Sequence, residues 1–218
     1  MADGDKWFEN AWAVREEKVY PSLFGPCGGD SIYPLDQVIF EVFKKGGSDP
    51  RWLTHGVIKF PPTEARKSWL FVTSGLSNAW EDKEPEPEGP SGLGCELVME
   101  TCGDFGWALF HLRRLLAYQT LLGWGRYEGK DCLGFGDRIP LQAPIDGNQS
   151  LLTWCLVVPP AGYPPEFQLP SGRVTLLHIV GVTDAEIRFA GEQGYPALLR
   201  KLSPSGYPVT DASRDSVV

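Results

Sequence analysis

Apolar residues recur at helical spacing in two long stretches of the chain. The first covers residues 7–20, and Pro21 is expected to end it. The second covers residues 105–122, with Arg113 and Arg114 on its polar face and Gly123 closing it as a C-cap. Both stretches are amphipathic, so each should pack one face against a core.

Two shorter helices are predicted near the carboxyl end. Thr183-Asp184-Ala185-Glu186 has the form of a capping box, which starts a helix that should run to about Glu192. Pro196 suits the first position of a last helix that ends near Leu202.

The remaining apolar stretches have the length and composition of β-strands. They cover residues 38–43, 52–60, 69–73, 94–102, 151–158 and 174–180, with a short edge strand over 207–211. The stretches 81–92, 124–149 and 159–171 are rich in Gly and Pro and are predicted to be loops.

The strand over 94–102 has two different faces. Cys95, Leu97 and Met99 share one face, whereas Glu96 and Glu100 lie on the other with Val98. The two carboxylates are expected to face solvent, at a separation of about 13 Å along the strand. About six strands and four helices predict an α+β (mixed α/β) fold, with a central, mostly antiparallel or mixed sheet flanked by helices.

Composition narrows the class of protein. The 218 residues are 42% hydrophobic, which is enough for one substantial core, and no second core is visible, so we expect a single domain over 1–218. The net charge is −8, which argues against a nucleic-acid partner. Residues 1–110 hold 10 basic and 18 acidic residues, whereas 111–218 hold 10 of each, so all the net charge lies in the first half.

The chain also lacks targeting and metal signals. No apolar run approaches the ~18–20 residues of a membrane helix, and the first residues lack the pattern of a signal peptide. The five cysteines are an odd number without a CxxC pair, which favours reduced thiols in a cytoplasmic protein. We therefore expect no membrane association, no metal and no cofactor.

The sequence does not match the residue spacing of the catalytic and cofactor-binding motifs that it partly resembles. The distance expected between Glu96 and Glu100 exceeds the roughly 5 to 9.5 Å of a glycosidase pair. Residues 89–93 end in Leu rather than the Gly of a nucleophile elbow, and residues 123–129 follow a helix and do not fit a dinucleotide fingerprint. No enzyme is predicted; a ligand near His178, Cys155 or Asp137 would contradict this. The polar loop 126–138 is either an ordinary loop or a binding loop.

Several ordered motifs resemble the suppressor of fused (SUFU) domain family. They are Trp69-Leu70-Phe71-Val72-Thr73-Ser74-Gly75-Leu76-Ser77, Gly89-Pro90-Ser91-Gly92-Leu93-Gly94-Cys95-Glu96-Leu97, the helix Trp107 to Tyr118, Gly136-Asp137, residues 172–186 and Val209-Thr210-Asp211. The resemblance covers residues 38–218, and residues 1–37 form an N-terminal helix and lead-in.

The resemblance implies a protein-binding domain rather than an enzyme. Animal members clamp an extended peptide of a transcription factor between two lobes, and this chain resembles the first lobe. Tyr118 stands where the family helix presents a ligand-contacting Tyr, and Asp137 where a G-D motif presents an acid. Arg138 replaces the family's His. Phe135 in the same loop is a further candidate contact.

Domains of this size resemble the bacterial branch, which is associated with toxin systems. The first hypothesis is therefore an immunity protein that neutralises a cognate, basic toxin domain; the alternative is a peptide-binding regulatory module. Because the acidic loop would suit a basic partner, its acids are candidate contacts. They are Glu81, Asp82, Glu84, Glu86 and Glu88.

Overall fold

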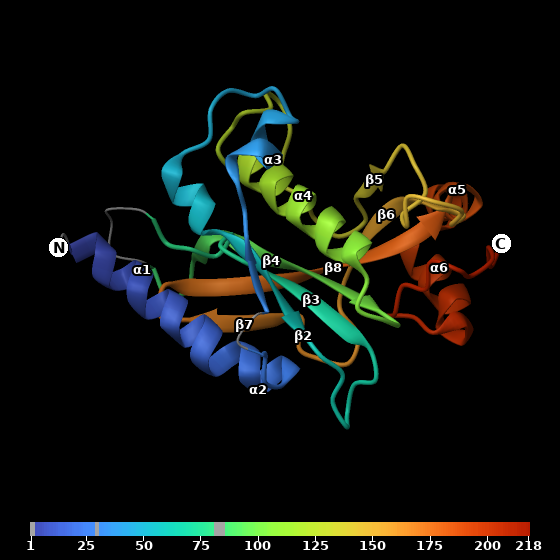
Figure 1. The fold of residues 1–218 in the computed structure, drawn as a ribbon, viewed down its shortest axis with the longest axis horizontal. Coiled ribbons are helices and arrows are strands. Elements are labelled where there is room, and N and C mark those ends of the chain that lie inside the picture. Colours follow the sequence, from blue (N-terminus) through green and yellow to red (C-terminus); the bar gives the residue numbers. More distant parts are fainter. Residues whose placement is uncertain (1–2, 29–30, 81–85) are drawn as a thin grey trace.

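The computed structural model describes residues 3–28, 31–80 and 86–218, and it is built around one mixed eight-stranded sheet (Figure 1). The strand order is β1-β2-β3-β4-β8-β6-β5, with β7 paired to β8 beside this path. The pair β4–β8 is parallel and the other pairs are antiparallel. The strands are β1 (Ile32–Pro34), β2 (Gly56–Phe60), β3 (Trp69–Ser74), β4 (Pro90–Thr101), β5 (Arg138–Pro140), β6 (Leu152–Val158), β7 (Glu166–Leu169) and β8 (Gly172–Thr183).

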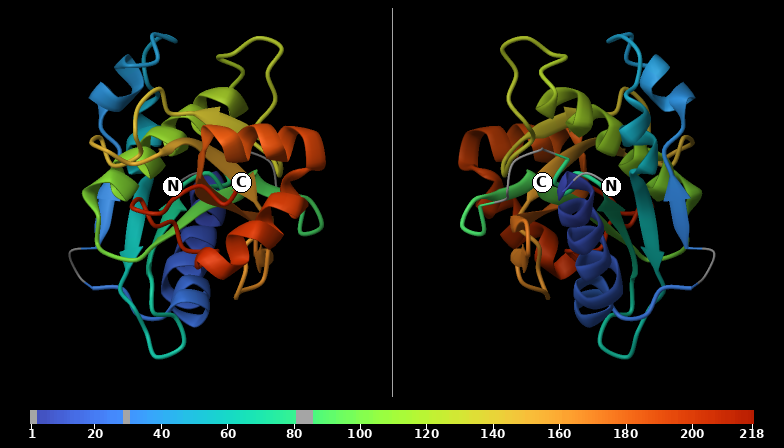
Figure 2. Two further views of the ribbon diagram at one scale, coloured as in Figure 1. Left: turned by 90° about the vertical axis from the view of Figure 1, so that its right-hand side faces the viewer. Right: turned by 90° about the vertical axis from the view of Figure 1, so that its left-hand side faces the viewer.

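Helices cover both faces of the sheet (Figures 1 and 2). Helix α4 packs on one face, against the side chains of Leu97 and Met99. The N-terminal helices cover the other face beside Val98, and α5 and α6 cover the end of that face formed by β6 and β8. The helical segments are α1 (Asp3–Val14), the π-helical turn Arg15–Val19, α2 (Tyr20–Phe24), α3 (Gln37–Glu41), α4 (Gly106–Gly123), α5 (Asp184–Gln193) and α6 (Tyr195–Leu202), with short 3-10 turns at Pro50–Thr54 and Ser203–Ser205.

The mixed fold class is confirmed, but the predicted strand count was too low. The sheet has eight strands rather than about six, because β1 and β5 have three residues each and β7 lies inside the predicted loop 159–171. Such short strands leave too few alternating positions to be recognised from sequence.

The predicted strand over 38–43 is wrong, since α3 occupies most of it. The Asp36 side chain accepts a hydrogen bond from the Ile39 backbone N–H at 3.0 Å and caps this helix. Likewise, the first part of the predicted strand 52–60 forms a 3-10 turn, and only Gly56–Phe60 is extended. The helix predicted to stop at Pro21 continues to Phe24, since the π-helical turn Arg15–Val19 leads directly into α2, whose first turn contains Pro21.

The capping box is confirmed. The Thr183 hydroxyl accepts from the Glu186 N–H, while the Glu186 carboxylate accepts from the Thr183 N–H. Pro196 lies in the first turn of α6, as predicted.

The expected solvent exposure of Glu96 and Glu100 is wrong. They do share a face with Val98, but α1–α2 and Tyr163 cover that face, so both carboxylates are buried. Glu96 accepts hydrogen bonds from the N–H groups of Gly75 and Ser77 at 3.0 Å each, and from two hydroxyls. Glu100 accepts from the Ser68 hydroxyl at 2.5 Å, and burial raises its pKa.

Two buried histidines predict a loss of stability in mild acid. Burial lowers the pKa of His55 and His178 to about 4, against ~6.5 in an unfolded chain. Between these values the unfolded chain binds more protons, so the free energy of unfolding should fall as the pH falls from 6.5 to 4, by up to roughly 3 kcal/mol per histidine. Glu100 has the opposite effect on the free energy of unfolding. Because its pKa is raised in the folded state, the folded protein binds this proton at a higher pH than the unfolded chain does.

The measurement is the urea midpoint between pH 7.5 and 4.5. His178→Phe should reduce the slope, because it removes one of the two histidines whose pKa is about 4. A midpoint that stays constant over this range would contradict the argument.

Candidate functional site

A groove of about 760 Å³ lies between α4 and the edge strand β5. Its apolar floor comes from both elements and from the loop between them, and it includes Leu115, Leu122, Leu133, Ile139 and Leu141. Because β5 ends the strand order, the groove runs beside an open edge of the sheet.

Three aromatic rings form one end of the groove. The Tyr118 ring on α4 lies 6.0 Å from that of Phe43, which follows α3, and 5.2 Å from that of Tyr127 in the loop after α4. All three side chains are partly exposed. Tyr118 thus lines the groove rather than lying in the core.

His111 marks the opposite part of the groove. Its Nε2 lies 2.8 Å from the Ile145 carbonyl oxygen, and burial lowers the pKa of the imidazole. The ring is therefore neutral at pH 7, and the Phe110 ring stands beside it at 5.2 Å.

The outer edge of β5 offers backbone groups for pairing. The Asp137 carbonyl accepts from the Val157 N–H, and the Leu141 N–H donates to the Thr153 carbonyl, so these residues and Ile139 face β6. Alternation along the strand turns the N–H and C=O of Arg138 outward. Pro140 also faces outward but has no N–H, so Arg138 carries the one outward amide donor of β5.

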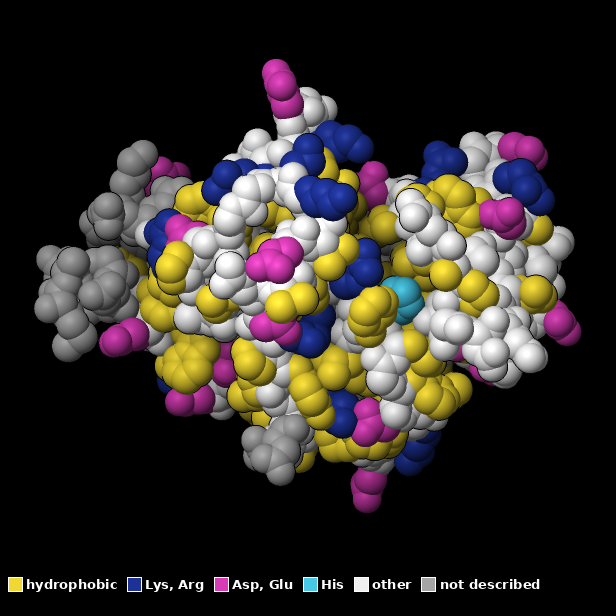
Figure 3. All heavy atoms as spheres, turned by 45° about the horizontal axis from the view of Figure 1, so that its top comes forward, with side chains coloured by type: hydrophobic (Ala, Val, Ile, Leu, Met, Phe, Trp, Pro, Cys, Tyr) yellow, Lys and Arg dark blue, Asp and Glu magenta, His cyan; other side chains and the backbone are white. Residues whose placement is uncertain are grey.

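Charge on the rim of the groove is mainly basic. The groove is lined by Arg114, Lys130, Asp131 and Asp137, whereas the guanidinium of Arg138 lies beside Gly191 on α5. Lys45 lies beside it, with its ammonium 4.5 Å from the centre of the Tyr127 ring. Within the described ranges Arg114, Lys130 and Lys45 form no ion pair, and Figure 3 shows Lys and Arg side chains on this face with Asp and Glu among them.

The structure brings together three of the predicted contact residues. Tyr118, Asp137 and Arg138 all line the groove, whereas Phe135 is exposed outside it. The Asp137 carboxylate accepts from the Gly134 N–H at 2.8 Å, which holds the turn before β5. Sequence reasoning missed Phe43 and Lys130, which reach the groove only through the fold.

The described acids of the acidic loop do not line this groove. Glu81, Asp82 and Glu84 lie outside the described residues. Glu86 and Glu88 are exposed, and Glu86 lines a different pocket.

Catalytic or metal chemistry has no obvious centre in the described residues. The groove lining contains no serine, threonine or cysteine among them. No group of three or more metal-ligating side chains occurs in the ranges that the structure covers. Among these residues, no helix is long and apolar enough to span a membrane.

Comparison with known proteins gives one consistent relationship. The model of the suppressor of fused protein (SUFU) family matches residues 51–215. The human and mouse suppressor of fused homologs are each 25% identical over 217 residues, covering 90% of this chain. The chain spans only 43% of the length of these relatives.

Solved structures agree on the fold. The crystal structure of a Sufu–Fu complex matches with a TM-score of 0.67 at 23% identity, covering 97% of this chain and 92% of that one. A SUFU homolog from Neisseria gonorrhoeae matches with a TM-score of 0.63 at 15% identity, covering 98% of both chains. The family model matches most of the length of the present chain, which therefore belongs to the suppressor of fused family.

Proposed function

We propose that this protein is a binding module that holds an extended segment of a partner protein in the groove between α4 and β5. The observation that carries the proposal is the open edge of β5 beside an apolar, aromatic-lined groove. A segment that pairs with Arg138 would extend the sheet by one strand, and its side chains would alternate between the groove and solvent. That one similar structure is a Sufu–Fu complex supports protein binding as the family's mode of action.

The charge of the groove favours an acidic segment. Arg114 and Lys130 have no ion-pair partner within the described ranges, so a carboxylate placed near them would gain attraction without breaking an existing pair. This is the opposite of the basic partner expected from the net charge of −8. The toxin-immunity hypothesis gains no support from the comparisons, and its basic partner does not suit this groove.

Selection from a library of random peptides of about a dozen residues tests the proposal. We expect enriched peptides to be rich in Asp and Glu and to bind the protein in fluorescence anisotropy. Tyr118→Ala should weaken binding at least about tenfold, because an aromatic anchor at the centre of such a site typically contributes 2 kcal/mol or more.

Tyr33→Ala is the matched control, since Tyr33 lies on β1 at the opposite edge of the sheet. If no peptide is enriched, or if Tyr118→Ala binds as well as the wild type, the groove is not the binding site. Enrichment of basic peptides would contradict the acidic partner but not the groove.

A further inference from the structure

A second pocket, of about 440 Å³, opens beyond the C-terminal end of α4 and shares no lining residue with the groove. Its walls combine polar and aromatic side chains, and its described lining includes His55, Leu76, Asn78, Trp80, Leu93 and Trp124. Nothing in the proposed peptide binding uses it.

Glycines form the tightly packed back of this pocket. Gly75 has φ +144°, and a Cβ there would come within 2.4 Å of the His55 ring. Gly92 has φ +55°, and a Cβ there would come within 2.5 Å of the Asn78 carbonyl oxygen. Larger residues cannot occupy these positions without moving His55 or Asn78, so the walls of the pocket are fixed before any ligand enters.

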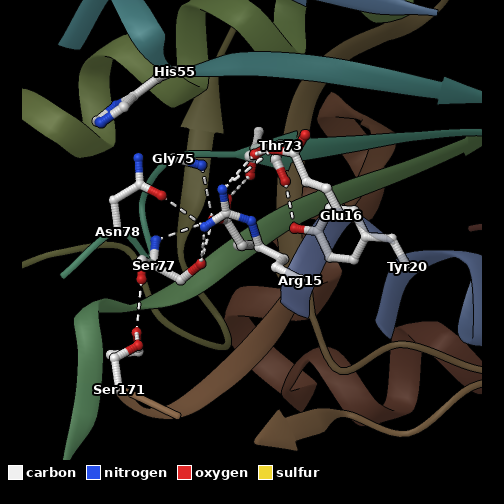
Figure 4. Close-up of polar contacts among 12 residues, drawn as sticks. Arg15, Glu16, Tyr20, His55, Thr73, Gly75, Ser77, Asn78 and Ser171 are labelled. Atoms are coloured by element: carbon white, nitrogen blue, oxygen red, sulfur yellow. Dashed lines mark hydrogen bonds and ion pairs between the residues drawn. The ribbon is translucent and has the colours of Figure 1, made fainter. Parts of the chain in front are cut away.

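Asn78 directs an unused donor into the pocket. Its side chain is nearly buried, with 4% exposure, and its Oδ1 accepts a hydrogen bond from Arg15 Nη1 at 2.7 Å. This contact fixes the orientation of the amide, because an amide nitrogen in the place of Oδ1 would bring its N–H against the N–H of Arg15. Figure 4 shows the amide nitrogen turned toward the side where His55 lies, and it has no hydrogen-bond partner in the described part of the chain.

His55 offers the complementary acceptor. Its side chain is 2% exposed, and its Nδ1 lies 3.5 Å from the Thr120 hydroxyl, whose own proton goes to the Leu116 carbonyl. This contact favours the tautomer with the proton on Nδ1, in which Nε2 is an acceptor. Nε2 has no partner among the described residues, and burial lowers the imidazole pKa to about 4, so the ring is neutral at pH 7.

Two indole rings supply flat walls. Trp80 stacks on Phe8 with 4.0 Å between ring centres, and its Nε1–H has no hydrogen-bond partner in the described ranges. The Arg51 guanidinium lies 5.9 Å from the centre of the Trp80 ring and 5.0 Å from that of Trp124. Both rings thus lie close to the same cation.

We propose that this pocket binds a small molecule in which a planar aromatic ring carries a carboxamide. The ring would lie against the indoles, the carbonyl oxygen would accept from Asn78 and Trp80, and the amide N–H would donate to His55. Small-molecule sites combine such apolar walls with a few convergent polar groups. A carboxylate would lack the N–H that His55 requires, and an aliphatic amide would lack the ring.

Benzamide is the probe, and the indole N–H signals of ¹⁵N-labelled protein are the readout. The signals of Trp80 and Trp124 are assigned with Trp80→Phe and Trp124→Phe. We expect saturable shifts of these two signals, while Trp154, whose indole N–H is bonded to Asp184 at the far end of the sheet, stays unchanged. Benzoate, acetophenone and acetamide should each bind at least about tenfold more weakly.

Asn78→Asp tests the donor directly. The new carboxylate can still accept from Arg15, but it cannot donate into the pocket, so we expect benzamide to bind at least about tenfold more weakly. An unchanged Trp154 signal shows that the variant is folded. Absence of saturable shifts in the wild type, equal binding of benzoate, or unchanged affinity of a folded Asn78→Asp would each overturn the proposal; the first two do not depend on the variant.

Discussion

Arg15→Met is expected to destabilise the protein by about 3–5 kcal/mol, because it leaves a buried carboxylate without its cation. Arg15 is fully buried, and its Nη1 lies 3.8 Å from the Glu96 carboxylate. The same guanidinium donates to the hydroxyls of Ser77 and Ser74 at 2.9 and 2.7 Å (Figure 4). Methionine fills a similar volume but satisfies none of these acceptors.

The free energy of unfolding in urea measures this effect. Arg188→Met is the control, because Arg188 and Asp184 form an exposed pair at 4.0 Å, which should contribute less than ~0.5 kcal/mol. The double variant Arg15→Met/Glu96→Leu should lose less than the sum of its single variants, because it removes both charges together. A loss below about 1 kcal/mol for Arg15→Met would show that Glu96 does not depend on this cation.

The same ion pair shows how far the sequence could predict this fold. The alternation of 94–102 correctly divided β4 into two faces, since a strand's side chains alternate whatever lies above them. It could not show that α1–α2 would cover the face of Glu96, because that contact joins residues about 80 positions apart. For the same reason, the helical period of residues 7–20 could not show that Arg15 would be buried.

Local signals succeeded where one segment carries all the information. The capping box at Thr183 and the proline of α6 act within a few residues, and both predictions are confirmed. The strand prediction for residues 38–43 was wrong, because six apolar and charged residues fit the period of a helix as well as that of a strand. The Asp36 N-cap was the available signal, and it was overlooked.

Identifying the groove and its charge required both the sequence and the structure. Tyr118 and Asp137 were identified through the family resemblance, and the structure places both in the groove. Its basic rim could not be read from the sequence, because Arg114 and Lys130 are scattered along a chain whose net charge is negative.

Arg138→Pro is expected to lower the affinity for a selected peptide at least about tenfold more than Arg138→Ala does. Both variants remove the guanidinium, so the difference between them reports the backbone N–H alone. Proline deletes the one outward amide donor of β5, while the hydrogen bonds of Asp137 and Leu141 to β6 remain available. Strand addition depends on that donor, whereas a peptide held only by side chains does not.

Fluorescence anisotropy gives the two affinities, and unchanged thermal unfolding shows that the proline variant is folded. Hydrogen exchange on the wild type provides a measurement that does not depend on the variant. Peptide binding should slow exchange of the Arg138 amide, while the amide of Ile32 on β1, the opposite edge of the sheet, should be unaffected. Equal affinities of the two variants together with an unprotected Arg138 amide would mean that the groove binds through side chains and that β5 gains no strand.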